Sequence, residues 1–390
     1  MSTQISFGSL VRESVNDLLG KSHPIQNNDV HIQEGLKWLC HAQDKSGDNG
    51  VSAWYSLISG WQPSYIETTG YIINTFLDTD RLYKKMKLKD RAVRMADFLI
   101  KMQHPLGGYR TAVPSKAVES VPTVFNTGQD LLGMAAVFSA TKKEKYRASA
   151  ILAADFLLSI QEKDGSWLQY TYGSMKHTYH TRVAWGILEV WKITGKKKYL
   201  TAARKNIDWA AKQQQPNGWF KQNQLPHPNP SIPYTHTIAY AIEGFLWSGL
   251  LLQDDHYMQI AIKGALPLAD LYLKNEFLPG TFDSNWKSEN SYTCLTGDAQ
   301  LALVWLELFK YGHDFVFLKA AVKMIEYLKS VQPTEKDYDQ NLRGSLKGSY
   351  PIYGDLHKNT GYCRFAYLNW ATKFFIDALV VEEQIALSLT

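Results

Sequence analysis

The chain has 390 residues, of which 45% are hydrophobic and 20% are charged, and its formal net charge is +5. These values are ordinary for a soluble globular protein that can bury a large core. No basic run is longer than Lys196-Lys197-Lys198, so we expect no nucleic-acid partner.

Cysteine content and the N-terminal sequence indicate the compartment. Three cysteines do not make a disulfide framework, which favours a reducing environment. The first residues, MSTQISFGSLVRES, lack the charged and apolar regions of a signal peptide, and no apolar stretch is long enough to span a membrane. We therefore expect a cytoplasmic protein without an integral membrane segment. The oligomeric state is not indicated.

Helical patterns of two kinds alternate along the chain after an N-terminal extension, residues 1–29, that carries one short helix. One kind, such as RAVRMADFLIKMQ, has apolar residues at i, i+3 and i+4 with charges opposite, which is typical of a half-exposed outer helix. The other kind is rich in Gly and Ala, which predicts an inner helix. The expected outer/inner pairs are 30–43/69–78, 89–103/127–140, 144–161/181–194, 198–214/237–252, 257–275/296–311 and 315–332/360–380.

A threonine suited to capping precedes each inner pattern, at separations of 54 to 64 residues. These residues are Thr69, Thr127, Thr181, Thr237, Thr296 and Thr360. Six hairpins of similar length predict an all-α (α/α)6 toroid, with residues 1–390 as a single domain and the inner helices lining a central cavity. An open solenoid is the alternative, and it would show polar capping repeats at its ends.

Long aromatic loops lead into the inner helices, whose N-termini gather at one end of the predicted ring, here called the mouth. Binding sites are common on such loops. We expect catalytic residues among His180, His236, Glu67, Asp298 and Tyr234. We expect substrate-binding residues among Trp54, Tyr65, Tyr109, Asn126, Gln129, Trp167, Arg182, Trp219, Trp286, Tyr292, Tyr353 and Arg364.

Aromatic rings mixed with amides, histidines and carboxylates suit a saccharide, and a uronate would suit the arginines and histidines. Hydrolysis of a glycosidic bond normally needs two carboxyl groups, for which Glu67 and Asp298 are the best pair. Elimination or epimerisation instead needs a neutral base such as His180, His236 or Tyr234. The sequence leaves these two chemistries open.

Sequence motifs of this chain resemble those of two groups of α/α toroids. LLSIQEKDGSW, residues 157–167, resembles the Gln-Trp repeat of squalene/hopene cyclases and prenyltransferase β-subunits, and it implies a toroid. The acidic motifs that carry the chemistry of those enzymes are absent from this sequence, so the resemblance does not extend to their activity. An isoprenoid enzyme is therefore only the alternative function. The six-hairpin count, the FNTGQ stretch at 125–129 and the aromatic mouth resemble six-hairpin glycoside hydrolases, polysaccharide lyases and uronyl epimerases. This resemblance implies an enzyme acting on a poly- or oligosaccharide.

Two further possibilities concern metal and loss of catalysis. Cys294, His180 and His236 occupy cap positions of consecutive repeats, with Cys363 one turn inside another, which resembles zinc-binding toroids. No Cys-x-x-Cys or adjacent Cys-His pair is present, so we expect no metal and no cofactor. A non-catalytic glycan-binding toroid is the other alternative, in which isolated aromatics would line the mouth.

Overall fold

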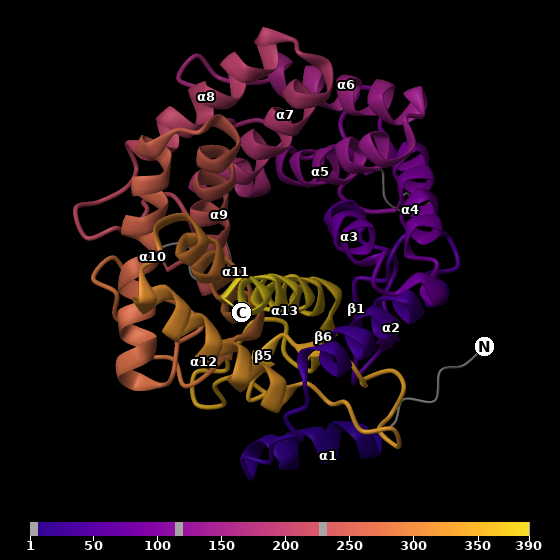
Figure 1. Cartoon of the computed structure of the whole chain (residues 1–390), viewed down its shortest axis with the longest axis vertical. Coiled ribbons are helices and arrows are strands. Elements are labelled where there is room, and N and C mark those ends of the chain that lie inside the picture. The colour runs from indigo at the N-terminus through magenta and orange to yellow at the C-terminus, as the bar shows by residue number, and fades with distance from the viewer. Residues whose placement is uncertain (1–6, 114–119, 226–231, 390) are drawn as a thin grey trace.

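The computed structural model describes residues 7–113, 120–225 and 232–389, and within them the chain forms a closed ring of paired helices (Figure 1). The outer helices are α2 (Asn28–Ser46), α4 (Leu88–Met102), α6 (Glu144–Ser159), α8 (Lys197–Ala211), α10 (Asp255–Asn275) and α12 (Phe315–Val331). The inner helices are α3 (Ile66–Thr79), α5 (Val124–Thr141), α7 (Thr181–Thr194), α9 (Thr235–Leu252), α11 (Leu295–Gly312) and α13 (Asn369–Leu389). The predicted (α/α)6 toroid is confirmed.

Close packing of the inner helices closes the ring. Each inner helix contacts the next, and α13 contacts both α11 and α3, so the last hairpin meets the first. A Cβ at Gly133 would clash with the carbonyl oxygen of Gly70, and one at Gly186 with that of Gly128. The small residues of the inner patterns therefore allow neighbouring backbones to touch, as their composition predicted.

Polar side chains near the ends of the outer helices join each outer helix to the next one. The Gln161 amide donates to the Gly165 carbonyl of its own turn at 3.0 Å and to the Ala202 carbonyl of α8 at 2.9 Å. Gln332 closes the circle by donating to Gly344 at 2.6 Å and to His31 of α2 at 3.4 Å. The residues that make these joints are Gln43, Gln103, Gln161, Gln214, Tyr272 and Gln332.

The glycines of the turns that follow Gln161 and Gln332 are required by two constraints at once. Gly165 has a φ of 93° and Gly344 has a φ of 91°, in the region that favours glycine. A Cβ at Gly344 would also clash with the Glu34 carbonyl of the neighbouring outer helix. In the fourth hairpin Gln214 makes the joint, since its amide donates to the carbonyls of Gly218 and Ile260.

Threonines of the inner helices bind the loop that precedes them. Thr69 Oγ1 accepts a hydrogen bond from the Val51 N–H at 3.0 Å and donates to the Tyr65 carbonyl at 2.7 Å. Thr127 Oγ1 similarly accepts from the Tyr109 N–H at 2.9 Å. The expected capping role is therefore wrong for Thr69 and Thr127. Their hydroxyls instead accept hydrogen bonds from N–H groups of the mouth loops and so hold these loops against the first turn of the helix.

The sixth inner helix begins later than expected. Thr360 lies in a turn and pairs with Asp355 through two backbone hydrogen bonds, whereas α13 begins at Asn369. Thr372 makes the same two contacts as Thr69 in the first hairpin. Its hydroxyl accepts from the Leu346 N–H at 3.1 Å and donates to the Leu368 carbonyl at 2.9 Å. The other five threonines lie in the first turn of their helices, as predicted.

Short strands and 3₁₀ turns lie in the loops between the helices. Two antiparallel sheets join mouth loops, with the orders β2-β1-β6-β4 and β3-β5. Their strands are β1 (Trp54–Ser56), β2 (Gly60–Trp61), β3 (Thr293–Cys294), β4 (Leu346–Lys347), β5 (Ser349–Tyr350) and β6 (Ala366–Leu368). Within the described residues, the 3₁₀ turns are η1 (Lys84–Met86), η2 (Tyr172–Ser174) and η3 (Thr178–His180).

Helix α1 (Phe7–Leu18) is the short helix expected in the N-terminal extension, and it packs outside the ring (Figure 1). Its buried Glu13 accepts hydrogen bonds from the hydroxyls of Tyr338 at 2.6 Å and Tyr367 at 2.7 Å. Asp17 pairs with Lys347 at 2.5 Å. Polar contacts therefore hold this helix against the last hairpin.

Replacing Gln332 by alanine should lower the free energy of unfolding by about 1–3 kcal/mol, because the backbone acceptors of Gly344 and His31 lose their donor. Chemical denaturation measures the change. The matched control is Gln340→Ala, which removes an exposed glutamine from the same loop and should change stability by less than about 0.5 kcal/mol. Equal effects of the two variants would contradict the role of the joint.

Candidate functional site

A cavity of about 550 Å³ opens at the mouth end of the ring, and we call it the mouth cavity. The first turns of α3, α5 and α9 surround it together with the loops before them and the start of α13. Five of the expected site residues line this cavity: Trp54, Tyr65, Glu67, Asn126 and His236. They come from three different hairpins, which the closed ring brings together.

Seven of the other seventeen described lining residues of the mouth cavity are aromatic and were not among the expected site residues. Tyr71 and Tyr240 lie one turn deeper on α3 and α9 than the residues that were considered. Tyr362 and Trp370 were missed because the sixth threonine was misplaced, although Trp370 stands before Thr372 as Glu67 stands before Thr69. The aromatic lining residues outside the expected set are Tyr71, Phe125, Tyr172, Tyr179, Tyr240, Tyr362 and Trp370.

Glu67 places a carboxyl group with unusual acidity in the mouth cavity. Only 7% of the residue is exposed, and burial raises the pKa of its carboxyl to about 7. The Tyr65 hydroxyl donates a hydrogen bond to Glu67 Oε2 at 2.8 Å, which fixes the orientation of the carboxyl. Near neutral pH this group can therefore give or take a proton.

His236 is held in one tautomer by a chain of hydrogen bonds. Gln300 donates its amide N–H to Glu243 Oε2 at 3.0 Å, so its oxygen accepts from His236 Nδ1 at 2.5 Å. The proton of the neutral ring therefore lies on Nδ1, and Nε2 is left with a lone pair. Burial lowers the pKa of His236 to about 3, so the imidazole is neutral at physiological pH.

A buried ion pair lies behind this chain. The Arg182 guanidinium pairs with Glu243 Oε2, and both side chains are 1% exposed. Arg182 also donates from Nε to Gln129 Oε1 at 2.8 Å and lies 4.7 Å from the centre of the Tyr240 ring. The expected substrate-binding residues Gln129 and Arg182 therefore form a layer beneath the mouth cavity.

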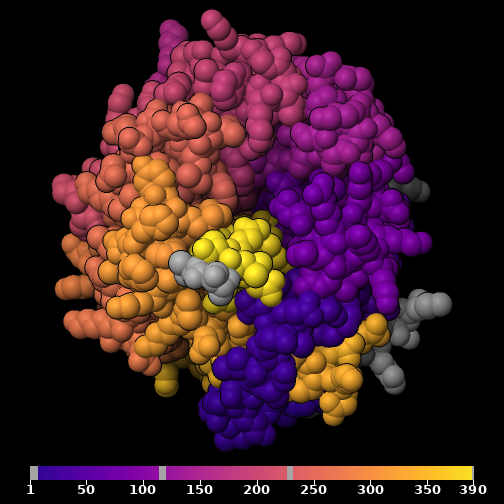
Figure 2. Space-filling model, viewed as in Figure 1, coloured from indigo at the N-terminus to yellow at the C-terminus, as the bar shows by residue number. Residues whose placement is uncertain are grey.

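The Arg182 layer separates the mouth cavity from a second one, the rear cavity, which has a volume of about 650 Å³. The rear cavity is lined from the C-terminal parts of the inner helices, and the two cavities share no lining residue among those described. The space-filling view shows a hollow beside the yellow end of α13, near the centre of the ring (Figure 2). Arg182 and Glu243 belong to the rear lining.

His180 lies in the wall of the ring rather than on the mouth cavity. It belongs to the 3₁₀ turn η3, and its ring is packed 6.0 Å from that of Trp167 and 6.2 Å from that of Phe125. Burial keeps the pKa of His180 well below its usual value. Although His180 and His236 hold the same place in their repeats, only His236 reaches the cavity.

Asp298 is also distant from the mouth cavity. It is fully buried and lines a separate hollow of about 210 Å³ beside Tyr272 and Tyr327 of the outer helices α10 and α12. Burial holds the pKa of its carboxyl well above the usual range. The structure therefore does not bring Glu67 and Asp298 together in one cavity.

Three expected residues, Tyr234, Trp286 and Tyr292, line a neighbouring groove of about 810 Å³ that we call the lateral groove. The other expected site residues line neither the mouth cavity nor the lateral groove, and some of them have structural partners. The Tyr109 hydroxyl bonds Ser149 at 2.7 Å, and the Trp167 N–H bonds the Leu157 carbonyl at 2.9 Å. The residues that line neither the mouth cavity nor the lateral groove include Tyr109, Trp167, Trp219, Tyr353 and Arg364.

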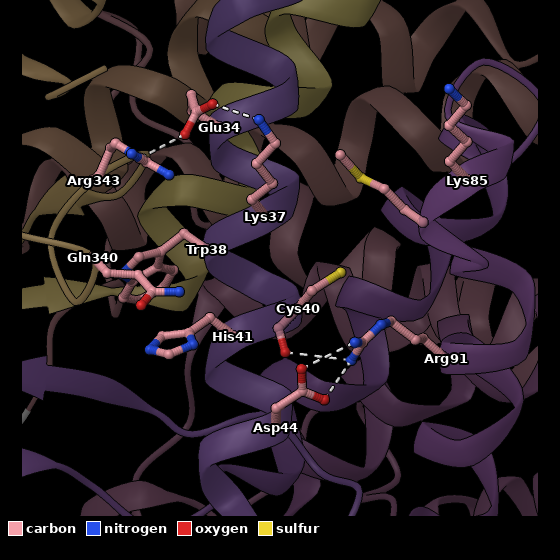
Figure 3. Close-up of a pocket in the computed structure, with 11 residues that line it drawn as sticks. Glu34, Lys37, Trp38, Cys40, His41, Asp44, Lys85, Arg91, Gln340 and Arg343 are labelled. Carbon is pink, nitrogen blue, oxygen red and sulfur yellow. Dashed lines mark hydrogen bonds and ion pairs between the residues drawn. The ribbon is translucent and has the colours of Figure 1, made fainter. Parts of the chain in front are cut away.

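A shallow hollow on the outer wall is built around α2 (Figure 3). Its cations are largely engaged, since Arg91 pairs with Asp44 at 2.8 Å and both Lys37 and Arg343 pair with Glu34. This hollow lies away from the inner-helix N-termini and contains none of the expected site residues.

Residues 7–113, 120–225 and 232–389 contain neither a cluster of metal ligands nor a membrane-spanning helix. No group of three or more His, Cys, Asp or Glu side chains is arranged there to hold a metal ion. Over the same residues, no helix combines the length and apolar character needed to cross a bilayer.

The closed ring of six hairpins with its aromatic mouth is the architecture of the six-hairpin α/α toroids, as the sequence resemblance implied. Residues 123–186, from the start of α5 into α7, match the family described as pectic acid lyase. A sequence search of curated proteins finds no match.

Similar solved structures are carbohydrate enzymes of this fold. An unsaturated glucuronyl hydrolase specific for heparin has a TM-score of 0.72 and 16% identity, covering 92% of this chain and 97% of that one. A cellobiose 2-epimerase from Bacillus thermoamylovorans B4167 has a TM-score of 0.70 and 12% identity, covering 97% and 100%. A D-mannose isomerase has a TM-score of 0.70 and 12% identity, covering 92% and 97%. At these identities the likeness shows the fold.

Replacing Arg182 by methionine should lower the free energy of unfolding by about 3–5 kcal/mol, because the buried Glu243 carboxylate loses its counter-ion. Denaturant titration measures this loss. The control is Arg147→Met, which breaks the exposed pair with Glu144 and should cost no more than about 1 kcal/mol. Equal losses in the two variants would show that the Arg182 pair is not the buried anchor described.

Proposed function

We propose that this protein is a carbohydrate-active enzyme that transfers a proton at a sugar carbon, by epimerisation or isomerisation. The observation that carries the proposal is the mouth cavity, where a neutral imidazole with a fixed tautomer and a carboxyl with a raised pKa share an aromatic enclosure. Aromatic faces suit the apolar faces of sugar rings, and a few oriented polar groups give such pockets their specificity.

The proposed reaction uses the two titratable groups as base and acid. His236 Nε2 takes the proton from the carbon next to the sugar carbonyl, and the C–H electron pair moves to form a carbon–carbon double bond. The carbonyl oxygen takes the proton of the Glu67 carboxyl, which leaves a neutral enediol. Transfer of the proton from His236 to the former carbonyl carbon, with loss of the proton of the neighbouring hydroxyl to Glu67, gives the isomeric sugar. Protonation of the original carbon on its opposite face, with loss of the proton on the former carbonyl oxygen to Glu67, gives the epimer.

Hydrolysis receives less support from the cavity. Both the retaining and the inverting mechanisms use two carboxyl groups placed on either side of the scissile bond. Among the described residues that line the mouth cavity, Glu67 is the one carboxylic acid. Asp298, its expected partner, faces the separate hollow beside α10 and α12.

Elimination on a uronate is the second candidate, and the match of residues 123–186 to pectic acid lyase favours it. It begins with the same step, because a base removes the proton next to the uronate carboxyl group. No lysine or arginine lies among the described lining residues of the mouth cavity. The partial positive charges of the inner-helix N-termini would then have to balance the uronate charge.

A screen of reducing sugars and uronate oligomers in D₂O tests the proposal. Epimerisation or isomerisation should place deuterium on carbon, seen as a gain of one mass unit, and His236→Asn should slow this exchange by roughly 10²–10⁴-fold. The matched control is His31→Asn, since His31 also bonds a glutamine through Nδ1, at 2.6 Å, but stands on the outer helix α2. It should keep the exchange rate of the parent protein at temperatures where both variants are folded.

Other products of the same screen would contradict the first candidate. An unsaturated product that absorbs ultraviolet light would identify elimination instead. Shorter saccharides that have gained one water, without deuterium on carbon, would favour hydrolysis and remove His236 as the base. Saccharide binding without any turnover would identify a glycan-binding toroid.

The pH dependence of turnover should follow Glu67. If its carboxyl gives the proton, kcat/KM stays level below about pH 7, the pKa to which burial raises this group. Above that value it should fall about tenfold per pH unit, because the deprotonated carboxylate has no proton to give. Glu67→Gln should lower the rate and abolish this fall. A rate that rises through pH 7 would assign Glu67 the role of base.

A further inference from the structure

The lateral groove opens beside the mouth cavity. Its walls come from residues 232–234 before α9, the end of α10, the loop at 279–292 and the turn at 358–360. Its volume of about 810 Å³ falls in the range of pockets that hold small organic ligands. The chemistry proposed for the mouth cavity does not use it.

Two tyrosines form the boundary between the groove and the mouth cavity. Tyr234 lines the groove, and its ring centre lies 5.2 Å from that of Tyr362, which lines the mouth cavity. His236 follows Tyr234 by two residues and faces the mouth cavity. A ligand that passes over this boundary would therefore touch both spaces.

Trp286 stands in the groove on a loop that holds it in place. Its φ of 58° is unfavourable for a bulky residue, and the loop stabilises this conformation with several bonds. Asp283 Oδ1 accepts from the N–H groups of Asn285 at 2.8 Å and Lys287 at 2.9 Å. The Trp286 indole N–H donates to the Asn217 carbonyl at 2.9 Å. The indole is thus fixed before any ligand arrives.

The polar residues of the groove indicate the type of ligand. Its charged lining residues balance, with Asp283 and Glu289 opposite in sign to Lys287 and Lys358. Amide and hydroxyl groups such as Asn275 and Ser288 lie among the aromatic rings of the same lining. A neutral ligand with many hydroxyls and apolar ring faces fits this mixture better than a strongly charged one.

We propose that the lateral groove binds the remote, uncharged units of an oligosaccharide whose reacting end lies in the mouth cavity. The inference rests on the proposed function, because a saccharide in the mouth is what the groove would extend. It assigns the enzyme a substrate longer than a disaccharide, with Trp286 as the stacking platform for a unit that does not react.

Calorimetric titration with dimers and hexamers of three series tests the groove: cello-oligosaccharides, malto-oligosaccharides and galacturonates. In at least one neutral series the hexamer should bind at least tenfold more tightly than the dimer, which corresponds to about 1.4 kcal/mol. Trp286→Ala should reduce this ratio to about twofold or less, whereas Trp286→Phe should retain most of it. The control is Trp247→Ala in the rear cavity, which should leave the ratio unchanged.

Equal affinity for dimers and hexamers in all three series, or an unchanged ratio in Trp286→Ala, overturns the proposal. A length preference confined to the galacturonates would contradict its neutral ligand. His236→Asn separates this proposal from the proposed function, because it should keep the length preference while losing turnover. Turnover of disaccharides without any length preference would refute the groove alone.

Discussion

The hydrogen bonds that join neighbouring outer helices are the constraint on which the ring depends. A glutamine amide carries two N–H donors, so one side chain can hold its own turn and the next outer helix at a fixed spacing. Where α10 has no such glutamine, the Tyr272 hydroxyl bonds the Lys323 carbonyl of α12 at 3.2 Å. Gln332 then joins the last outer helix, α12, to the first, α2. Because each joint holds neighbouring hairpins in a similar relative orientation, six of them close the ring.

The closed ring in turn fixes the chemistry at its axis. Residues of α5, α7, α9 and α11 meet there in one chain of contacts, which are Gln129, Arg182, Glu243, Gln300 and His236. Burying an arginine and a glutamate is costly unless both are well paired, and the surrounding rings of Tyr71 and Tyr240 add cation–π contacts. The scaffold thereby keeps His236 of the mouth cavity neutral, with its proton on Nδ1.

The repeating parts of this protein could be predicted from sequence, whereas contacts between hairpins could not. The stretch around Thr360 imitates an inner-helix start, but it lies in a turn of the long last loop, and Thr372 holds the true position. His180 and His236 are equivalent by spacing, yet η3 delays the start of α7, so His180 turns into the wall. The hydrogen bond between Gln300 and Glu243 could not be predicted, because it depends on how α9 and α11 are rotated against each other.

The Arg182 layer has a consequence for how a polymer could be handled. Arg182 is 1% exposed and packs against the rings of Tyr71, Tyr240 and Phe374. These side chains therefore fill the ring between the mouth cavity and the rear cavity, and a glycan chain that enters from the mouth meets them. Such a blind-ended space admits chain termini rather than interior segments. Each product must also leave from the mouth end, where the substrate entered.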